Sequence, residues 1–183
     1  MTQLSLRGAL GNQSSPEETS NPSKKSFLNW LLQKTSGKTI YVYDEPYLTR
    51  YYLLGNGSGK SFEIYVHHMH KIDEFRWLHN HPWRWFLSIV LSGSYWQETL
   101  NCRNGKHKHE HIRRLNLFRK LDQYHAIREL PKGTAWTLVV VPPKQHDHQW
   151  GYWDTETSCH ISDETIGHES ARTETFGRKV LKD

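Results

Sequence analysis

The 183-residue sequence has little of several features that define common protein classes. It contains only two cysteines, Cys102 and Cys159, which excludes a disulfide scaffold and a cysteine-rich zinc site. No apolar run approaches the roughly 20 residues that span a bilayer, and the N-terminal MTQLSLRGALGNQSS lacks the continuous apolar segment of a secretory signal. We therefore expect a cytoplasmic protein in a reducing compartment, with no membrane partner.

Several catalytic and nucleotide-binding motifs are also missing. The sequence has no Gly-rich phosphate loop, no nucleophile elbow and no paired Asp/Glu motif, which argues against P-loop, Rossmann and serine-hydrolase classes. The net charge of +5 is spread along the chain without a block of like charges. Such a modest excess can steer a small anionic ligand, but it does not predict nucleic acid as a partner.

Aromatic residues and histidine, in contrast, are plentiful. Eight Trp, nine Tyr and six Phe supply the apolar area of a packed core, and there are 13 His. Residues 1–25 are too polar to offset their ordering entropy, so we expect a disordered arm there. Ser26 can cap one short amphipathic helix over 26–34, and 161–183 is expected to be a polar C-terminal tail. A single β domain over 26–160 is the expected organisation.

From Thr39 onward the apolar residues alternate with a period of two, which indicates strands. The breaks between them, such as GNGSG, SG and PKG, have the turn chemistry of antiparallel hairpins. A regular series of strands without helices predicts an all-β, antiparallel barrel. The expected strands are 39–43, 47–54, 61–70, 85–91, 94–100, 111–118, 124–130 and 135–141, with a further edge strand within 151–160.

His79 and His81 lie two residues apart in LHNHPW, so on an extended segment both imidazoles point to one face. Pro82 places the pair at the start of a strand or at a bulge. His125, on a later strand, is a third candidate ligand. Three imidazoles from two strands would form a facial triad with open positions, which suits non-haem Fe(II) or catalytic Zn(II). An H-x-H pair can also be a merely hydrogen-bonded or solvated pair.

The spacing around these histidines resembles the first motif of the cupin family. The H-x-H pair is followed by Gly93 twelve residues after His81, and His125 falls where the second motif has its metal-binding His. The resemblance covers roughly residues 47–153. Phe86 occupies the position of the motif's Glu, and the second motif's Pro, Gly and Asn are replaced by Lys120, Asp122 and Glu129.

The segment HNHPWRWFLSIVLSGSYWQE is similar to thiol dioxygenases such as cysteine dioxygenase, cupins that keep only three His. A closer likeness is to uncharacterised bacterial and phage cupin-like proteins with L-H-x-H-P-W, carried here by residues 78–83. These resemblances imply a cupin-like jelly-roll barrel and a divalent metal on His79, His81 and His125. Fe(II) is the expected metal, with Zn(II), Mn(II) and Ni(II) as alternatives.

Seven further residues are candidates for a substrate pocket. Arg50, on an otherwise apolar strand face, needs an anionic partner, which is either a substrate carboxylate or Glu63. His68 and His70 share a face with Ile64 and are expected either to line the barrel or to pack and hydrogen-bond behind the metal ligands. The aromatic candidates, which core packing also explains, are Trp83, Tyr95 and Trp136, and Glu98 is expected either to act on substrate or to pair with Arg84 or Arg113.

The histidines of KHKHEH (106–111) and HDH (146–148) sit among charged residues and are expected on solvated loops. The function expected from all of these features is a metal-binding cupin, an oxygenase acting on a small polar substrate. A metal-free cupin isomerase or epimerase, with a His base and Tyr95 as acid, is one alternative. A non-catalytic module for a sugar, protein or nucleic-acid partner is the other, and a homodimer is compatible with each.

Overall fold

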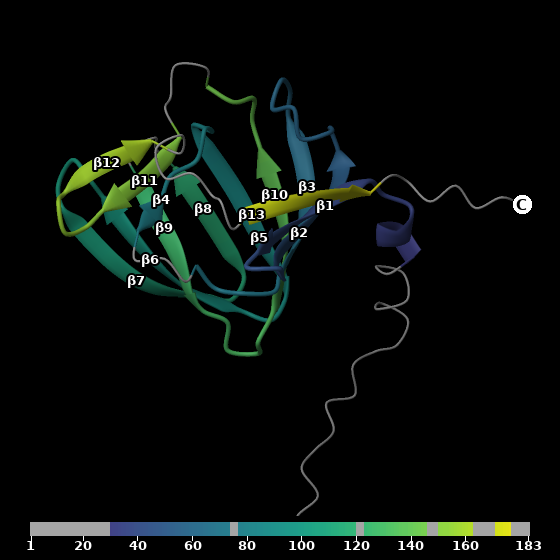
Figure 1. The fold of residues 1–183 in the computed structure, drawn as a ribbon, viewed down its shortest axis with the longest axis horizontal. Coiled ribbons are helices and arrows are strands. Elements are labelled where there is room, and N and C mark those ends of the chain that lie inside the picture. The colour runs from purple at the N-terminus through teal and green to yellow at the C-terminus, as the bar shows by residue number, and fades with distance from the viewer. Residues whose placement is uncertain (1–29, 74–76, 120–122, 146–149, 163–170, 177–183) are drawn as a thin grey trace, which may run out of the picture.

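The computed structural model describes residues 30–73, 77–119, 123–145, 150–162 and 171–176. The predicted arm over 1–25 and the first part of the predicted helix lie outside these residues. One helical turn is described at residues 30–33, and it buries Leu32. Everything else that is regular in the described part of the chain is β-strand, arranged as two antiparallel sheets (Figure 1). The expected all-β, antiparallel fold class is therefore confirmed.

The first sheet has seven strands, in which non-consecutive neighbours mark the crossovers of a jelly roll. Its spatial order is β13 (Ala171–Phe176), β1 (Gly37–Val42), β2 (Glu45–Leu54), β3 (Glu63–Met69), β10 (Ala135–Val141), β5 (Trp85–Ser92) and β8 (Leu115–Arg119).

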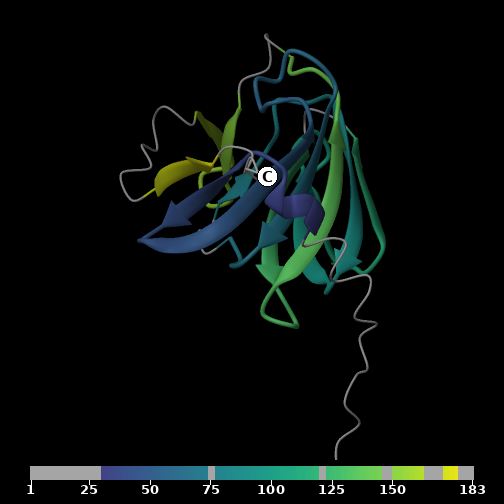
Figure 2. The same cartoon turned by 90° about the vertical axis from the view of Figure 1, so that its right-hand side faces the viewer.

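The second sheet has six strands and faces the first, as the turned view of Figure 2 also shows. Its spatial order is β12 (Cys159–Ser162), β11 (Gly151–Asp154), β4 (Leu78–His79), β9 (Gln123–Glu129), β6 (Tyr95–Asn101) and β7 (Lys106–Ile112). The short strand β4 lies between β11 and β9, so it brings the H-x-H segment to the middle of this sheet.

The core lies between the sheets and follows the two-residue period of the strands. In β10 the side chains of Ala135, Thr137, Val139 and Val141 are buried while the alternate residues are partly exposed. A main cluster of buried apolar side chains comes from the strands of the first sheet and from the β4–β5 connection, and it contains Tyr65, Trp83, Phe86, Phe118, Val139 and Val141. This cluster forms an aromatic wall beside the histidines described below.

Gly93, the glycine of the cupin-like motif, is required by the turn between β5 and β6. Its φ is +76°, and a Cβ there would lie 2.6 Å from the backbone oxygen of Thr134. Any other residue would combine an unfavourable left-handed conformation with a backbone clash.

Two segments differ from the sequence expectation. KHKHEH was expected as a loop, but it forms β7, an exposed edge strand that pairs with β6 from Tyr95 to Asn101. Pairing with β6 satisfies the backbone hydrogen bonds of this segment, although its polar side chains do not indicate a strand. Residues 161–183 were expected as a tail, yet they contribute β13, which pairs with β1.

Both cysteines, Cys102 and Cys159, are free thiols. Among the described residues, none belongs to a helix with the length and apolar character that crossing a membrane requires.

Candidate metal centre and its cavity

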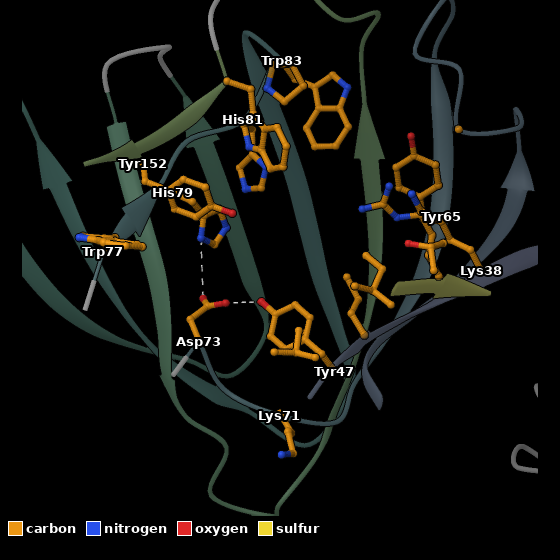
Figure 3. A pocket seen from close by; sticks show the side chains of 18 of the residues that line it. Lys38, Tyr47, Tyr65, Lys71, Asp73, Trp77, His79, His81, Trp83 and Tyr152 are labelled. Atoms are coloured by element: carbon orange, nitrogen blue, oxygen red, sulfur yellow. Dashed lines mark hydrogen bonds and ion pairs between the residues drawn. The ribbon is translucent and has the colours of Figure 1, made fainter. Parts of the chain in front are cut away.

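Three histidines from two parts of the chain meet between the sheets. His79 ends β4, His125 lies directly opposite it in β9, and His81 follows two residues after His79. The ring centroids are 4.5 Å apart for His79 and His125, 4.9 Å for His81 and His125, and 5.1 Å for His79 and His81. Cross-strand pairing thus brings together the three histidines that the sequence singled out (Figure 3 shows two of them).

The ring nitrogens of this cluster converge. One nitrogen from each ring lies within 4.8 Å of the others, and Nε2 of His81 is 2.7 Å from Nε2 of His125. Nδ1 of His125 is buried without a hydrogen-bond partner among the described residues. The hydrogen-bonding contact of the His125 ring is therefore made by Nε2, toward His81. Such a group can hold a divalent metal ion, and it is the only His/Cys/Asp/Glu trio of this kind in the described part of the chain.

Burial keeps these imidazoles neutral, which metal ligation requires. Loss of solvation lowers the pKa of His79, although the Asp73 carboxylate partly opposes this effect. Burial also holds the pKa of His81 and of His125 well below the usual value, and the neighbouring histidines add to the effect. At neutral pH each ring therefore presents a lone pair rather than a second proton.

Asp73, which no sequence motif marked, supports the cluster from the β3–β4 connection. Its Oδ2 accepts a 2.6 Å hydrogen bond from the Ile127 backbone amide and lies 3.9 Å from Nδ1 of His79. The Tyr47 hydroxyl donates to Oδ1 of the same carboxylate, as the dashed lines in Figure 3 show. Asp73 thereby favours the tautomer of His79 that leaves Nε2 free. An aspartate in such a connection has no local signal, so only the fold reveals it.

The histidines stand at the junction of two cavities. The outer cavity has a volume of about 450 Å³ and the inner one about 110 Å³. His79, His81, Arg50 and Trp83 line both, whereas His125 lines only the inner one. A volume of this size suits a small-molecule substrate.

Aromatic rings line the inner side of the cluster. The Trp83 ring stacks on His81 at 5.4 Å, and Phe86 meets His81 edge-on at 5.0 Å. Phe118 lies 5.0 Å from His125 and stacks on Phe86. Phe86, which stands at the motif's Glu position, thus contributes an apolar wall in place of a fourth ligand.

Arg50 lines the cavity, but its closest contacts are not with Glu63. Its Nε donates to Nε2 of His67 at 2.9 Å, and its guanidinium lies 4.6 Å from the centre of the Tyr65 ring. Glu63 is instead bound by the Tyr65 hydroxyl and by the backbone amides of Gly57 and Gly59. In place of the suggested ion pair with Glu63, Arg50 therefore contacts His67 and Tyr65 and shares a side-chain hydrogen bond with Tyr52.

The structure divides the predicted pocket residues into two groups. Arg50, Trp83 and Tyr95 line the cavities, and Tyr95 accepts a hydrogen bond from Asn116 in the inner one. The remaining four lie elsewhere, namely His68, His70, Glu98 and Trp136.

His68 of β3, and His70 just after the end of that strand, do not line the cavity. The inward face of that strand carries Glu63, Tyr65, His67 and Met69, whereas His68 stacks on Trp136 with ring centres 3.9 Å apart. Because Ile64 and Val66 are apolar, the sequence favoured an inward orientation for these two residues and for His68. In this sheet, however, both faces of the strand carry apolar side chains. His67, which was not singled out, is the histidine of β3 that faces the cavity.

Glu98 faces away from the cavity on β6. Its Oε2 accepts a 2.9 Å hydrogen bond from Nε of Arg128, and its Oε1 lies 3.4 Å from Nδ1 of His107. Its partners are therefore Arg128 and His107 rather than the two arginines suggested from the sequence, Arg84 and Arg113.

The known proteins found to be similar to this chain are solved structures. No protein-family model matches the sequence, and no curated protein matches it. Solved structures similar to it include hydroxypropylphosphonic acid epoxidase from S. wedmorenis, at 15% identity and a TM-score of 0.41, over 57% of this chain and 55% of that one. The match therefore spans little more than half of the epoxidase.

Two further structures are similarly distant. The polyketide cyclase RemF from Streptomyces resistomycificus matches at 17% identity and a TM-score of 0.38, over 54% of this chain and 67% of that one. An uncharacterised protein with a double-stranded β-helix domain from Klebsiella pneumoniae matches at 17% identity and a TM-score of 0.40, over 60% of this chain and 86% of that one. The function must therefore be inferred from the residues of this chain.

Proposed function

We propose that this protein is a metal-dependent, cupin-type oxygenase that holds Fe(II) on His79, His81 and His125 and oxidises a small polar substrate with O2. The observation that carries the proposal is the convergence of three neutral, largely buried imidazoles at the junction of two cavities. Zn(II), Mn(II) and Ni(II) are the alternative metals. A cytoplasmic location stays a prediction.

The donor set fits a catalytic metal better than a structural one. A structural site is closed by four protein ligands, whereas three imidazoles leave coordination positions for other molecules. When bound, Fe(II) supplies a binding site for O2 and the electrons that activate it. A substrate in the outer cavity would lie beside His79 and His81, which line it.

The residues around the cluster have separate tasks in this proposal. The Asp73 carboxylate, 3.9 Å from Nδ1 of His79, favours a proton on that nitrogen and so leaves Nε2 available to the metal. Burial and the Asp73 carboxylate raise the pKa of Tyr47 well above its usual value, so Tyr47 remains a hydrogen-bond donor at the cavity wall. The rings of Trp83 and Phe86 cover one side of His81, and such apolar cover would limit the access of water to oxidising chemistry there.

A second candidate function rests on Tyr95. This residue lines the inner cavity with His125, and burial raises the pKa of its hydroxyl. A protonated tyrosine and a neutral histidine on the wall of one cavity are the acid and base that a metal-free isomerase or epimerase needs. This alternative, like a non-catalytic binding module, requires no metal.

Nitric oxide distinguishes the proposals, because it binds ferrous centres that have an open coordination position. The protein would be loaded with Fe(II) without oxygen, exposed to nitric oxide and studied by electron paramagnetic resonance. We expect a ferrous nitrosyl signal that His81→Ala abolishes and that His109→Ala, an exposed control on β7, retains. Absence of the signal from the iron-loaded parent protein would favour the metal-free alternatives.

A further inference from the structure

The outer cavity carries more positive than negative groups. Lys38, Arg50, Lys71 and Lys144 line it, whereas Asp73 is its only acidic lining residue among those the structure describes. Lys71 pairs with Glu45. The other three cations, Lys38, Arg50 and Lys144, form a basic group on the cavity wall, and Figure 3 shows Lys38 across the cavity from His79.

The fold brings these three cations together from separate segments. Lys38 of β1 is the register partner of Arg50 of β2, and Arg50 is in turn opposite His67 of β3, so they form one row across the inner face of the first sheet. Lys144 follows β10, and its backbone amide donates to the Gly59 carbonyl at 2.9 Å. A Cβ on Gly59 would lie 2.4 Å from Cδ of Lys144, so the glycine makes room for the lysine stem.

The charge of this basic group is not balanced by carboxylates in the described residues. No described Asp or Glu forms an ion pair with any of the three. Glu63 is close enough to influence Arg50 electrostatically, but its oxygens are engaged by Tyr65, Gly57 and Gly59. Burial first, and then the positive charges of Arg50 and Lys144, lower the pKa of Lys38. Positive charges held close together at a cavity wall repel one another, and a bound anion would relieve that repulsion.

We propose that Lys38, Arg50 and Lys144 bind a phosphate-type dianion of the substrate, such as a phosphate or phosphonate group, while the rest of the molecule extends across the cavity toward the three histidines. This inference rests on the proposed function, since it names the substrate class of the same site. Three cations exceed what one carboxylate neutralises, whereas a dianion matches them better. The guanidinium of Arg50 adds a planar fork suited to phosphoryl oxygens.

Inorganic phosphate is the probe that tests this site. Isothermal titration calorimetry would measure phosphate binding to the metal-free and the Zn(II)-loaded full-length chain, at constant pH and ionic strength because salt screens such contacts. We expect binding in both forms, with Kd raised about tenfold or more by Lys38→Gln and by Lys144→Gln. The matched control is Lys60→Gln, which removes the same charge from the exposed end of the glycine-rich loop and should leave Kd unchanged.

Acetate at equal ionic strength separates a dianion site from a carboxylate site, and we expect acetate to compete weakly. Equal competition by acetate, an equal loss of phosphate binding in Lys60→Gln, or no phosphate binding to the parent chain would each overturn the assignment. Metal content, measured separately by mass spectrometry, distinguishes the two proposals. Lys38→Gln should keep its metal, so a parent chain that binds metal but not phosphate refutes the anion site and leaves the proposed metal centre standing.

Discussion

Two histidine-rich segments of this protein have the same alternate spacing and opposite surroundings. His79 and His81 are enclosed with His125 between two sheets, where aromatic rings and Asp73 surround them. His107 and His109 lie on the exposed face of the edge strand β7. The spacing alone does not distinguish them.

The partners of the two segments explain the difference. His109 and His111 stack on Trp96 at 5.0 and 4.6 Å, and His111 hydrogen-bonds to Ser94, so these rings cover the outside of a sheet. The enclosed rings instead turn nitrogens toward one another. An H-x-H pair becomes a candidate metal centre when burial keeps its imidazoles neutral and another strand adds a third histidine.

The largest contrast between the segments is expected in metal content. His81→Ala should reduce tightly bound metal from about one ion per chain to nearly none, because two imidazoles do not complete the site. His109→Ala, with the same chemical change on β7, should keep the metal. Inductively coupled plasma mass spectrometry after dialysis measures both. Equal metal loss in the two variants would mean that position in the fold does not decide ligation.

The second contrast is acid stability. Burial lowers the pKa of His67, His79, His81 and His125 in the folded state below the unfolded value near 6.5. The unfolded chain therefore binds more protons below that pH, so the stabilisation present above pH 6.5 is lost as the pH falls toward the folded values. Each of these residues contributes a loss of up to about 1.4 kcal/mol per pH unit.

Urea unfolding of the metal-free protein between pH 7 and 5 measures this slope. His67→Gln, which leaves the three candidate ligands intact, should make the slope shallower by about one proton. A free energy of unfolding that stays flat from pH 7 to 5 would show that the enclosed histidines are not buried as neutral rings.

The third expected effect is on the affinity for the metal rather than on the number of metal ions bound per chain. Asp73→Asn keeps the shape of the side chain but removes the charge beside Nδ1 of His79. We expect metal affinity to fall about 10- to 100-fold, the usual cost of losing the partner of a ligating histidine. Competition with a chromophoric chelator gives the affinity, and Glu98→Gln, on the outward face of β6, is the control. An unchanged affinity in Asp73→Asn would remove Asp73 from the site.

The smallest effect concerns the stability of the exposed segment. Replacing His109 by alanine removes one face of the stack on Trp96 but leaves no buried group without a partner. We expect a change in the free energy of unfolding within about 0.5 kcal/mol, as for other surface substitutions. Chemical denaturation is sufficient to measure it. A cost above about 2 kcal/mol would show that β7 is part of the core.

Most of the fold could be predicted from the sequence because alternation is a local signal. The stretch AWTLVVV predicts β10 with the boundaries that the structure has. Local signals failed where pairing partners decide the structure. The polar KHKHEH segment forms a strand only because β6 lies beside it, and β13 exists because β1 offers an edge.

The site residues that belong to a spaced motif were predictable from the sequence. Those that come together only through the fold were not. The H-x-H motif and His125 marked the cluster. The phase of β3 was ambiguous, so the sequence favoured His68 and His70 over His67. Asp73, Lys38 and Lys144 could not be found in advance, since each gains its role from segments far away in the chain.

Anomalous diffraction from crystals of the protein soaked in Fe(II) or Zn(II) tests the central claim most directly. The account predicts one strong peak per chain, at roughly 2.0–2.2 Å from one ring nitrogen each of His79, His81 and His125. Strong peaks on the β7 histidines with none between these three rings would contradict it.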